Sequence, residues 1–439
     1  ILYFVATVLF FIAILRDPDK KAILLNYASK IKANGLLLGI VVLYFIWDFC
    51  NFLYAENKAY ITGKYSFIVK MAFLACLLYA YIFYNNSEAK KSYTRMKQLM
   101  LNLGVVAIAL SVTSTLFYYI DFLTVQNYNI APTSDYNNYA LTILIGLSVL
   151  VTFIINGNID LGKKILYVSL SCMICIPPIY LSASRRSIYT MFGLIVLLFI
   201  IQTIKYIINK NREIHWKKIL LGIAAFFMTC VLIYTQIFCF NYFNEHNDIE
   251  GLSSSDRIQE DLESMGGGNE EQPQGDSLQV ERSFGQERVV IWKFALSKIN
   301  EMDIKELLIG GGGSYSNDIY AHYDNSMTTA AENLANYFSD DARIRMLDPH
   351  NFLLNDFLEG GIIKIAILMA MILKICFIIF KALKDKYEMS MSLLLISIIV
   401  ILSLMVSAHY GIMWGRWSIY IIVMAAALEG IIKWENISI

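Results

Sequence analysis

Residues 361–381 read GIIKIAILMAMILKICFIIFK, an apolar run long enough to cross a lipid bilayer as one helix. The run is continuous and lacks the alternation of a barrel strand, which favours a helix. Similar runs occur near 1–15, 36–54, 66–84, 99–121, 139–156, 163–182, 187–207, 218–240, 390–408 and 413–432. The sequence therefore predicts an all-α integral membrane protein with about 11 transmembrane helices.

The composition points to the same fold class. Of the 439 residues, 57% are hydrophobic and only 16% are charged, whereas soluble domains carry about 25% charged residues. This excludes a soluble domain, a disordered protein, a secreted disulfide scaffold and a simple nucleic-acid binder. The pair Cys172-x-x-Cys175 lies inside an apolar run without a second pair or a nearby histidine. We therefore expect these thiols to act as small hydrophobes and predict no metal site there.

The distribution of lysine and arginine orients the chain, because these residues collect in cytoplasmic loops. One alternate set of short loops carries twenty of them, and the other set carries only Lys58, Lys64, Arg185 and Arg186. The C-terminus is then expected in the cytoplasm and Ile1 outside. Because the chain begins with Ile1 rather than Met, we expect a twelfth helix before it, which would place both termini inside.

This orientation divides the chain into three parts. Residues 1–240 hold eight spans, residues 241–360 form one extracytoplasmic loop, and residues 361–439 hold the last three spans. Within the loop, residues 249–287 are acidic and rich in small residues, which predicts a flexible insertion. The segment Glu287–Leu296 then has apolar residues at helical spacing and predicts an amphipathic helix. Gly310–Gly313 either permit close backbone approach to a ligand or form a plain connector.

Two neighbouring arginines, Arg185 and Arg186, lie on the expected outer face against the general charge trend. Interfacial arginines that reach toward lipid headgroups are one interpretation. The other is an anion site, because a guanidinium matches the oxygens of a phosphate and nearby serine hydroxyls add donors. Those hydroxyls would come from Ser182, Ser184 and Ser187.

The expected outer loop holds two further candidates for chemistry, Arg288 and His350. Arg288 shares a helix face with Trp292, but a lone arginine on a helix is usually solvated or paired. His350 is expected near the outer membrane boundary at the start of a helix, where a capping histidine is the plain alternative. Asp348 lies close enough in sequence to orient its ring. His409 is a weaker second candidate.

A third outer segment, residues 131–140, carries no basic residue and leads into a span. Its side chains Asp135, Asn137 and Asn138 suit sugar hydroxyls, although Pro132 and Asp135 also fit a simple turn and helix start. The sequence contains no P-loop for ATP and no H-E-x-x-H zinc motif. Chemistry at the outer face therefore needs an activated donor already in the membrane, such as a lipid diphosphate.

Four pieces of sequence, in this order, resemble the O-antigen ligase and polymerase superfamily of bacterial membrane glycosyltransferases. They are Asp135–Ala140, Ser184-Arg185-Arg186, the Arg288-x-x-x-Trp292 helix with Gly310–Gly313, and Pro349-His350-Asn351-x-x-Leu354 with Glu359-Gly360-Gly361. The large loop before the last three spans matches as well. The resemblance covers most of residues 100–380, and the acidic insertion and the absent first helix are its departures.

The resemblance implies an inverting, metal-independent transfer of a glycan from undecaprenyl diphosphate, without a cofactor. Arg288 and one of Arg185 or Arg186 would hold the diphosphate and stabilise its departing charge. His350 would be the general base, a role that suits the pKa of about 6.5 of an ordinary histidine. Trp292 and Asn351 would join the segment at 135–138 in contacting the glycan or acceptor.

The resemblance leaves polymerase and ligase open, because both use the same catalytic parts and differ in the acceptor. We lean toward the polymerase, since the long loop and the Tyr- and Asn-rich outer segments suit two glycan chains. The expected location is the bacterial cytoplasmic (inner) membrane, with membrane lipid around the spans and the active site outside. A flippase and a chain-length regulator are expected partners, and nucleic acid is not.

Two rivals belong to other classes. A transporter fits the number of spans, but no inverted repeat is visible and few ionisable residues lie within spans, among them Asp48 and Lys364. A non-catalytic scaffold of an envelope assembly complex would tolerate the loss of His350.

Overall fold

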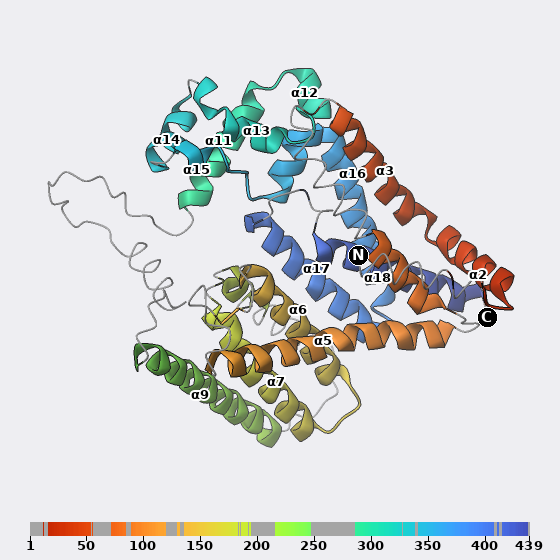
Figure 1. The fold of residues 1–439 in the computed structure, drawn as a ribbon. Coiled ribbons are helices and arrows are strands. Elements are labelled where there is room, and N and C mark those ends of the chain that lie inside the picture. The colour runs from red at the N-terminus through yellow and green to blue at the C-terminus, as the bar shows by residue number, and fades with distance from the viewer. Residues whose placement is uncertain are drawn as a thin grey trace. The chain divides into compact units, whose positions relative to one another are not determined.

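The computed structural model describes residues 12, 16–53, 55, 72–84, 89–119, 130–131, 136–182, 184, 186–191, 193–194, 216–246, 286–326, 328–338, 341–407, 411 and 415–437. Every regular element in these residues is a helix, as the sequence predicts (Figure 1). The predicted flexible insertion at 249–287 falls almost entirely outside them, as do Asp135, Arg185 and His409.

Seven described helices are long and apolar enough to span a membrane. They are α3 (Gly35–Leu53), α5 (Ala89–Tyr119), α6 (Tyr136–Asn156), α7 (Leu161–Leu181), α16 (Phe352–Ala382), α17 (Tyr387–Ser407) and α18 (Arg416–Ile437). Two shorter apolar stretches, Ala72–Phe83 and Ala224–Cys239, coincide with two other predicted spans. The protein is therefore a multi-pass membrane protein by helix length and composition. The larger count of 11 or 12 spans stays a prediction.

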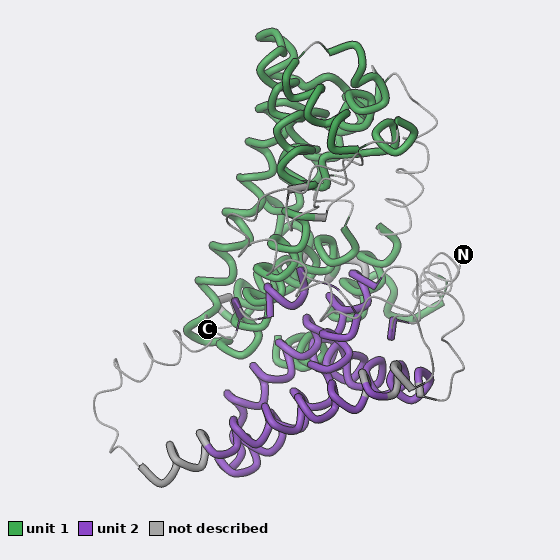
Figure 2. Tube along the Cα trace, turned by 90° about the vertical axis from the view of Figure 1, so that its left-hand side faces the viewer, with its two compact units in different colours: residues 1–97, 271–439 green, residues 98–270 purple. Residues whose placement is uncertain are grey.

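The chain separates into two compact units, coloured in Figure 2. Unit 1 holds residues 1–97 and 271–439, and unit 2 holds residues 98–270. These units are groups of residues that contact one another. The division at 240 and 360 predicted from the sequence has a different basis, because it separates segments by the side of the membrane on which they are expected.

Unit 2 is built from long helices that pack against one another. α7 packs between α6 and α9 (Trp216–His246), and α6 also approaches the part of α5 that belongs to this unit. A methyl group at Gly146 on α6 would meet the backbone carbonyl of Leu103 on α5. The absence of a side chain at this glycine is what permits the two helices to lie so close.

Unit 1 is organised around α16, which contacts α3, α17 and α18. Its helix begins at Phe352, nine residues before the apolar run that predicted a span at 361–381. The start is set by Asn351, whose side-chain oxygen accepts hydrogen bonds from the backbone N–H groups of Leu353 and Leu354. Gly361 then interrupts the helix with φ of 64° and ψ of −164°.

Between the spans, residues 286–344 form a group of short helices that we call the loop helices. They are α11 (Gln286–Glu301), α12 (Ile304–Ile309), α13 (Tyr315–Ala321), the 3-10 turn η1 (Tyr323–Asn325), α14 (Thr329–Tyr337) and α15 (Asp341–Ile344). α11 confirms the amphipathic helix predicted at Glu287–Leu296. Figure 1 shows the loop helices gathered at the Phe352 end of α16.

The loop helices share an apolar core of their own. Phe294 of α11, Tyr320 of α13 and Leu334 of α14 are completely buried in it, and Leu358 of α16 joins them. Burial of a large apolar side chain contributes about 1.5–3 kcal/mol to the stability of the fold. This core therefore fixes the loop helices to the N-terminal end of α16. The residues on these helices therefore have defined positions relative to α16.

Candidate functional site

The segment from Asp348 to Asn351 forms a tight turn that ends where α16 begins. His350 adopts a left-handed backbone conformation with φ of 48°, which is uncommon for a residue other than glycine. The Asp348 carboxylate stabilises the turn by accepting a hydrogen bond of 2.7 Å from the His350 backbone N–H. Strained conformations of this kind persist where the surroundings hold them, and they concentrate at functional sites.

The same carboxylate faces the imidazole ring. Asp348 Oδ1 lies 3.2 Å from His350 Nδ1, with only 14% of the histidine side chain and 8% of the aspartate side chain exposed. A carboxylate this close stabilises a proton on Nδ1, although the contact does not have the geometry of a hydrogen bond in the structure. With the proton on Nδ1, Nε2 would be the free base. The orienting role that the sequence offered for Asp348 thus has a geometric basis.

Trp292 supports this turn from α11. Its indole N–H donates a hydrogen bond of 2.8 Å to the carbonyl oxygen of Pro349, directly before His350. Asn351 is 5% exposed, and its side chain is used to cap α16. Both residues therefore position His350, whereas their predicted contact with a glycan stays a prediction.

Arg288 lies one helical turn before Trp292 on α11, so the two side chains share a face. The charge of Arg288 affects the pKa of Tyr320 on α13. Burial raises the pKa of Tyr320 well above its ordinary value, the charge of Asp348 adds to this rise, and the charge of Arg288 opposes it. The Tyr320 hydroxyl donates to the Ile291 carbonyl oxygen at 2.9 Å. The charges of Asp348 and Arg288 therefore both act on Tyr320.

The glycine run at 310–313 connects α12 to α13 and packs against two other helices. The backbone N–H groups of Gly311 and Gly312 donate to the carbonyl oxygens of Leu358 and Glu359 on α16. That of Gly313 donates to the Asn51 carbonyl oxygen at the end of α3. These donors are occupied by the protein, so the run joins the loop helices to α16 and α3.

A buried ionic cluster lies beside this junction. The ammonium group of Lys364 contacts the carboxylates of Asp48 at 2.7 Å, Asp356 at 3.0 Å and Glu359 at 3.4 Å. Tyr44 donates a 2.6 Å hydrogen bond to Asp356. Sequence reasoning noted Asp48 and Lys364 as unusual charges within spans, but it missed their pairing, because 316 positions separate them.

Two further hydrogen bonds hold the cluster to its surroundings. Ser316 of α13 donates to the Glu359 carboxylate at 3.1 Å, and the Trp47 indole of α3 donates to the Gly360 carbonyl oxygen at 2.9 Å. The cluster therefore ties α3, α13 and α16 together just beyond the turn that carries His350.

In unit 2, the structure brings two predicted segments together. The hydroxyl of Ser184 donates to the side-chain oxygen of Asn137 at 2.9 Å and lies 2.9 Å from the hydroxyl of Ser187. Arg186 is half-buried at the start of the following helix, and Asn138 is exposed. Of the three serines expected to bind an anion, Ser184 and Ser187 thus hydrogen-bond to each other and Ser184 to Asn137, while the Ser182 hydroxyl donates to the Ile179 carbonyl oxygen. The approach of Arg186 to the residues of unit 1 stays a prediction.

The arrangement in unit 1 suits proton transfer and charge stabilisation. It combines a carboxylate-oriented histidine with a half-buried arginine on the helix that supports the same turn. Within the described part of the chain, no group of three or more His, Cys, Asp or Glu side chains is arranged to hold a metal ion. No protein-family model matches the chain, and no curated protein matches it in sequence.

Proposed function

We propose that this protein is a membrane glycosyltransferase that polymerises oligosaccharide repeat units carried on undecaprenyl diphosphate. The reaction would occur at the outer face of the bacterial cytoplasmic membrane. The observation that carries the proposal is the contact of 3.2 Å between Asp348 and the Nδ1 atom of a strained, largely buried His350. A histidine held in this way is equipped to act as a general base.

In the proposed reaction, a hydroxyl group of the acceptor sugar attacks the anomeric carbon of the donor glycan. The new bond forms between the acceptor oxygen and that carbon, and the bond from the carbon to the diphosphate oxygen breaks. His350 Nε2 takes the proton of the hydroxyl group, and the lipid diphosphate leaves with the electron pair. Attack opposite the leaving group inverts the anomeric configuration.

The departing diphosphate needs positive charge, and Arg288 is the candidate in unit 1. Its face of α11 is directed to the His350 turn, as the hydrogen bond from Trp292 to Pro349 indicates. Arg185 or Arg186 would supply the second guanidinium, and Asp135, Asn137 and Asn138 would contact sugar. Preorganised charge of this kind is often the largest contribution to catalysis.

The first alternative is a ligase that transfers the lipid-linked glycan to a terminal acceptor such as a lipid A core. It would use the same His350 and Arg288. The second alternative is a polysaccharide transporter, and the buried cluster around Lys364 is the observation that favours it, because charges within spans often mark translocation pathways. Against it, Lys364 is completely buried and held by three carboxylates, as in a fixed structural contact.

The test is a gel analysis of envelope glycans in the native host. Wild type is compared with His350→Ala and Arg288→Ala, each at a matched protein level. His322→Ala and Arg343→Ala serve as controls, because these residues are exposed members of the same loop helices. The controls should give the wild-type pattern. General-base catalysis contributes roughly 10²–10⁴-fold, so His350→Ala should remove nearly all product.

The pattern of the mutants separates the alternatives. Single repeat units without a ladder support the polymerase. Long chains that accumulate on undecaprenyl diphosphate and never reach their final acceptor support the ligase. Unchanged glycans contradict the catalytic role of His350 and favour the transporter.

A further inference from the structure

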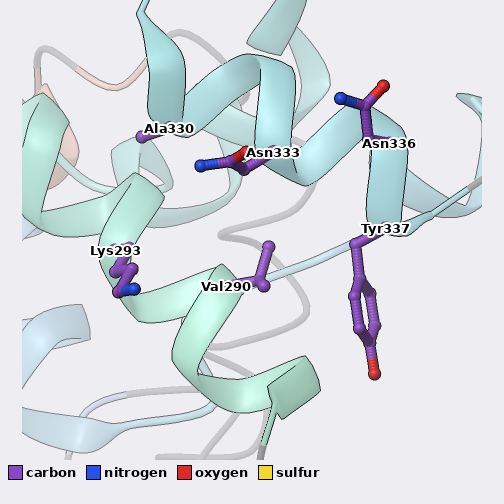
Figure 3. Close-up of a pocket in the computed structure, with 6 residues that line it drawn as sticks. All are labelled: Val290, Lys293, Ala330, Asn333, Asn336 and Tyr337. Atoms are coloured by element: carbon purple, nitrogen blue, oxygen red, sulfur yellow. The ribbon is translucent and has the colours of Figure 1, made fainter. Parts of the chain in front are cut away.

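A pocket lies between α11 and α14, on the loop helices. It has a volume of about 330 Å³ and is lined by Val290, Lys293, Ala330, Asn333, Asn336 and Tyr337. Figure 3 shows the Asn333 side chain in the space between the two helices, with Val290 and Lys293 on the facing helix. Its volume lies at the lower end of the ~300–1,000 Å³ that is typical of small-molecule sites.

The polar groups of this pocket are available to a ligand. In the part of the chain that the structure describes, the side chains of Lys293, Asn333 and Asn336 have no hydrogen-bond or ion-pair partner. Each is exposed to solvent. Folding therefore does not require them at these positions, and their common location on one pocket calls for another reason.

The chemistry of the lining matches a sugar. An asparagine amide offers two donors and an acceptor, which can bind a pair of neighbouring hydroxyl groups. The Tyr337 ring and the small apolar surface of Val290 and Ala330 can pack against the C–H face of a sugar ring. The Lys293 ammonium adds a positive charge, which favours a sugar that bears a carboxylate or phosphate group.

The pocket is separate from the His350 turn. At about 100° per residue, Lys293 lies ~140° and Val290 ~160° around α11 from Arg288. Trp292, in contrast, lies only ~40° from Arg288 and contacts Pro349. The pocket therefore opens on the other side of α11, roughly a helix diameter (~10 Å) from the face that carries Arg288.

We infer that this pocket is a second glycan-binding subsite, which holds an anionic sugar of the polysaccharide away from the reacting bond. The inference rests on the proposed function, because it assigns the pocket to the same glycan. A subsite at this distance keeps a growing chain attached between additions. Its loss should shorten the product without abolishing transfer.

The direct test measures binding of oligosaccharides released from the host's own surface polysaccharide to the purified full-length protein in nanodiscs. The pocket variant Lys293→Ala/Asn333→Ala is compared with Asn300→Ala/Lys305→Ala. The control replaces the same two residue types at exposed positions outside the pocket. Equal thermal midpoints establish that all proteins are folded. The pocket variant should bind with a Kd at least tenfold higher, and the control should bind like wild type. Equal binding by the pocket variant overturns the inference.

Two chemical treatments of the oligosaccharide test the charge and its source. Reduction of sugar carboxyl groups to alcohols should weaken binding if a carboxylate meets Lys293. Removal of phosphate groups should weaken it if a phosphate does. If neither treatment changes the Kd, the anionic part of the inference is wrong.

Glycan gels then separate this inference from the proposed function. The pocket variant should give a ladder of shorter chains in the host, whereas His350→Ala should give none. If His350→Ala abolishes the ladder and the pocket variant changes neither binding nor chain length, the subsite is wrong and the proposed function stands. If the pocket variant loses binding while His350→Ala leaves the glycans unchanged, the subsite stands and the proposed function is wrong.

Discussion

At the scale of single residues, the position of His350 depends on a few neighbouring groups. Asp348 accepts a hydrogen bond from the histidine backbone and faces Nδ1 of its ring. Trp292 holds the carbonyl of Pro349, and Asn351 ends the turn by capping α16. Because each contact fixes a different atom of the turn, the imidazole has little freedom to reorient, which is the preorganisation that acid–base catalysis requires.

Replacement of Asp348 by Asn tests this arrangement. The amide oxygen can still accept the hydrogen bond from the His350 backbone, so the turn should persist. The side chain loses its negative charge, however, and its NH₂ group can favour the tautomer with the proton on Nε2. The rate of glycan transfer should fall toward that of His350→Ala, a loss of roughly 10²–10⁴-fold.

The measurement is transfer from purified lipid-linked donor, with Asp324→Asn as the control. Asp324 is an exposed carboxylate that pairs with Arg345 on the surface of the loop helices. If Asp348→Asn keeps the wild-type rate while His350→Ala is inactive, the carboxylate does not set the tautomer. A wild-type rate for both Asp348→Asn and His350→Ala would contradict the role of His350 itself.

At the scale of elements, the join between α12 and α16 depends on glycine. Gly361 has φ of 64° and ψ of −164°, a region that is essentially limited to glycine. A methyl group there would lie 2.5 Å from the carbonyl group of Leu308, at the end of α12. Both the backbone conformation and the close approach therefore exclude a side chain at this position.

Gly361→Ala should reduce the free energy of unfolding by at least about 1–3 kcal/mol from backbone strain alone. The loop helices should also be cleaved faster by protease, since α12 loses its place on α16. Gly39→Ala is the matched control, because Gly39 lies within α3 with open space around it. It should be neutral or stabilising, since glycine is unfavourable inside a helix. Similar thermal midpoints for the two variants would contradict the argument.

The cluster around Lys364 makes a second connection between elements, here between α3 and α16. Lys364→Met leaves Asp48, Asp356 and Glu359 buried without their cation, and loss of one partner of a buried ion pair is destabilising by about 3–5 kcal/mol. The double variant Asp48→Asn/Lys364→Met should recover part of this loss, because it removes one unpaired charge. Lys381→Met, at the exposed end of the same helix, should have little effect.

Thermal midpoints in detergent give the coupling between Asp48 and Lys364 as a double-mutant cycle. If the double variant loses less stability than the two single variants together, Asp48 and Lys364 stabilise the fold as a pair. If Lys364→Met is as stable as wild type, the cluster does not hold α3 against α16. Retained stability with altered substrate movement would then favour the transporter.

These elements also show what a sequence can and cannot reveal. Local signals such as the amphipathic spacing of α11 and the apolar run of α16 predicted their helices, because helical periodicity is a property of neighbouring residues. The sequence predicts a helix start next to His350, which α16 confirms at Phe352, but it predicts the membrane span only from 361, because Asn355, Asp356 and Glu359 lower the hydropathy of the first turns. Asp356 and Glu359 are nonetheless buried, and they accept hydrogen bonds from Tyr44 and Ser316, which lie on distant helices that no local pattern identifies.

The candidate site was predictable to a similar degree. The sequence indicated His350, Arg288 and Trp292 mainly through the ordered motifs that resemble the O-antigen ligase and polymerase superfamily, and Asp348 through its closeness to His350 in the chain. It did not reveal that Trp292 supports the Pro349 carbonyl, or that the glycine run bonds to α16 and α3. Those contacts depend on the tertiary fold, which brings together residues far apart in the sequence, such as Trp292 and Pro349 at a separation of 57 positions.

At the scale of the whole molecule, the proposed function requires the His350 turn to face the outside of the cell. A donor on undecaprenyl diphosphate is available there, whereas nucleotide-activated sugars are not. The bias of twenty basic residues against four between alternate loops predicts this orientation. It also places the connection between α16 and α17 in the cytoplasm. Two exposed positions within unit 1 can therefore report opposite sides of the membrane.

Met346 is 84% exposed beside the His350 turn, and Lys384 is exposed between α16 and α17. A membrane-impermeant maleimide applied to intact cells should label Met346→Cys, whereas Lys384→Cys should react only after the membrane is permeabilised. The parent protein corrects for its seven native cysteines, which are all free in the structure. Labelling of Lys384→Cys alone in intact cells would invert the topology, move His350 to the cytoplasm and exclude transfer at the outer face. Labelling of Met346→Cys alone would place the histidine, the arginine on α11 and the pocket beside them on the side where the lipid-linked glycan is exposed.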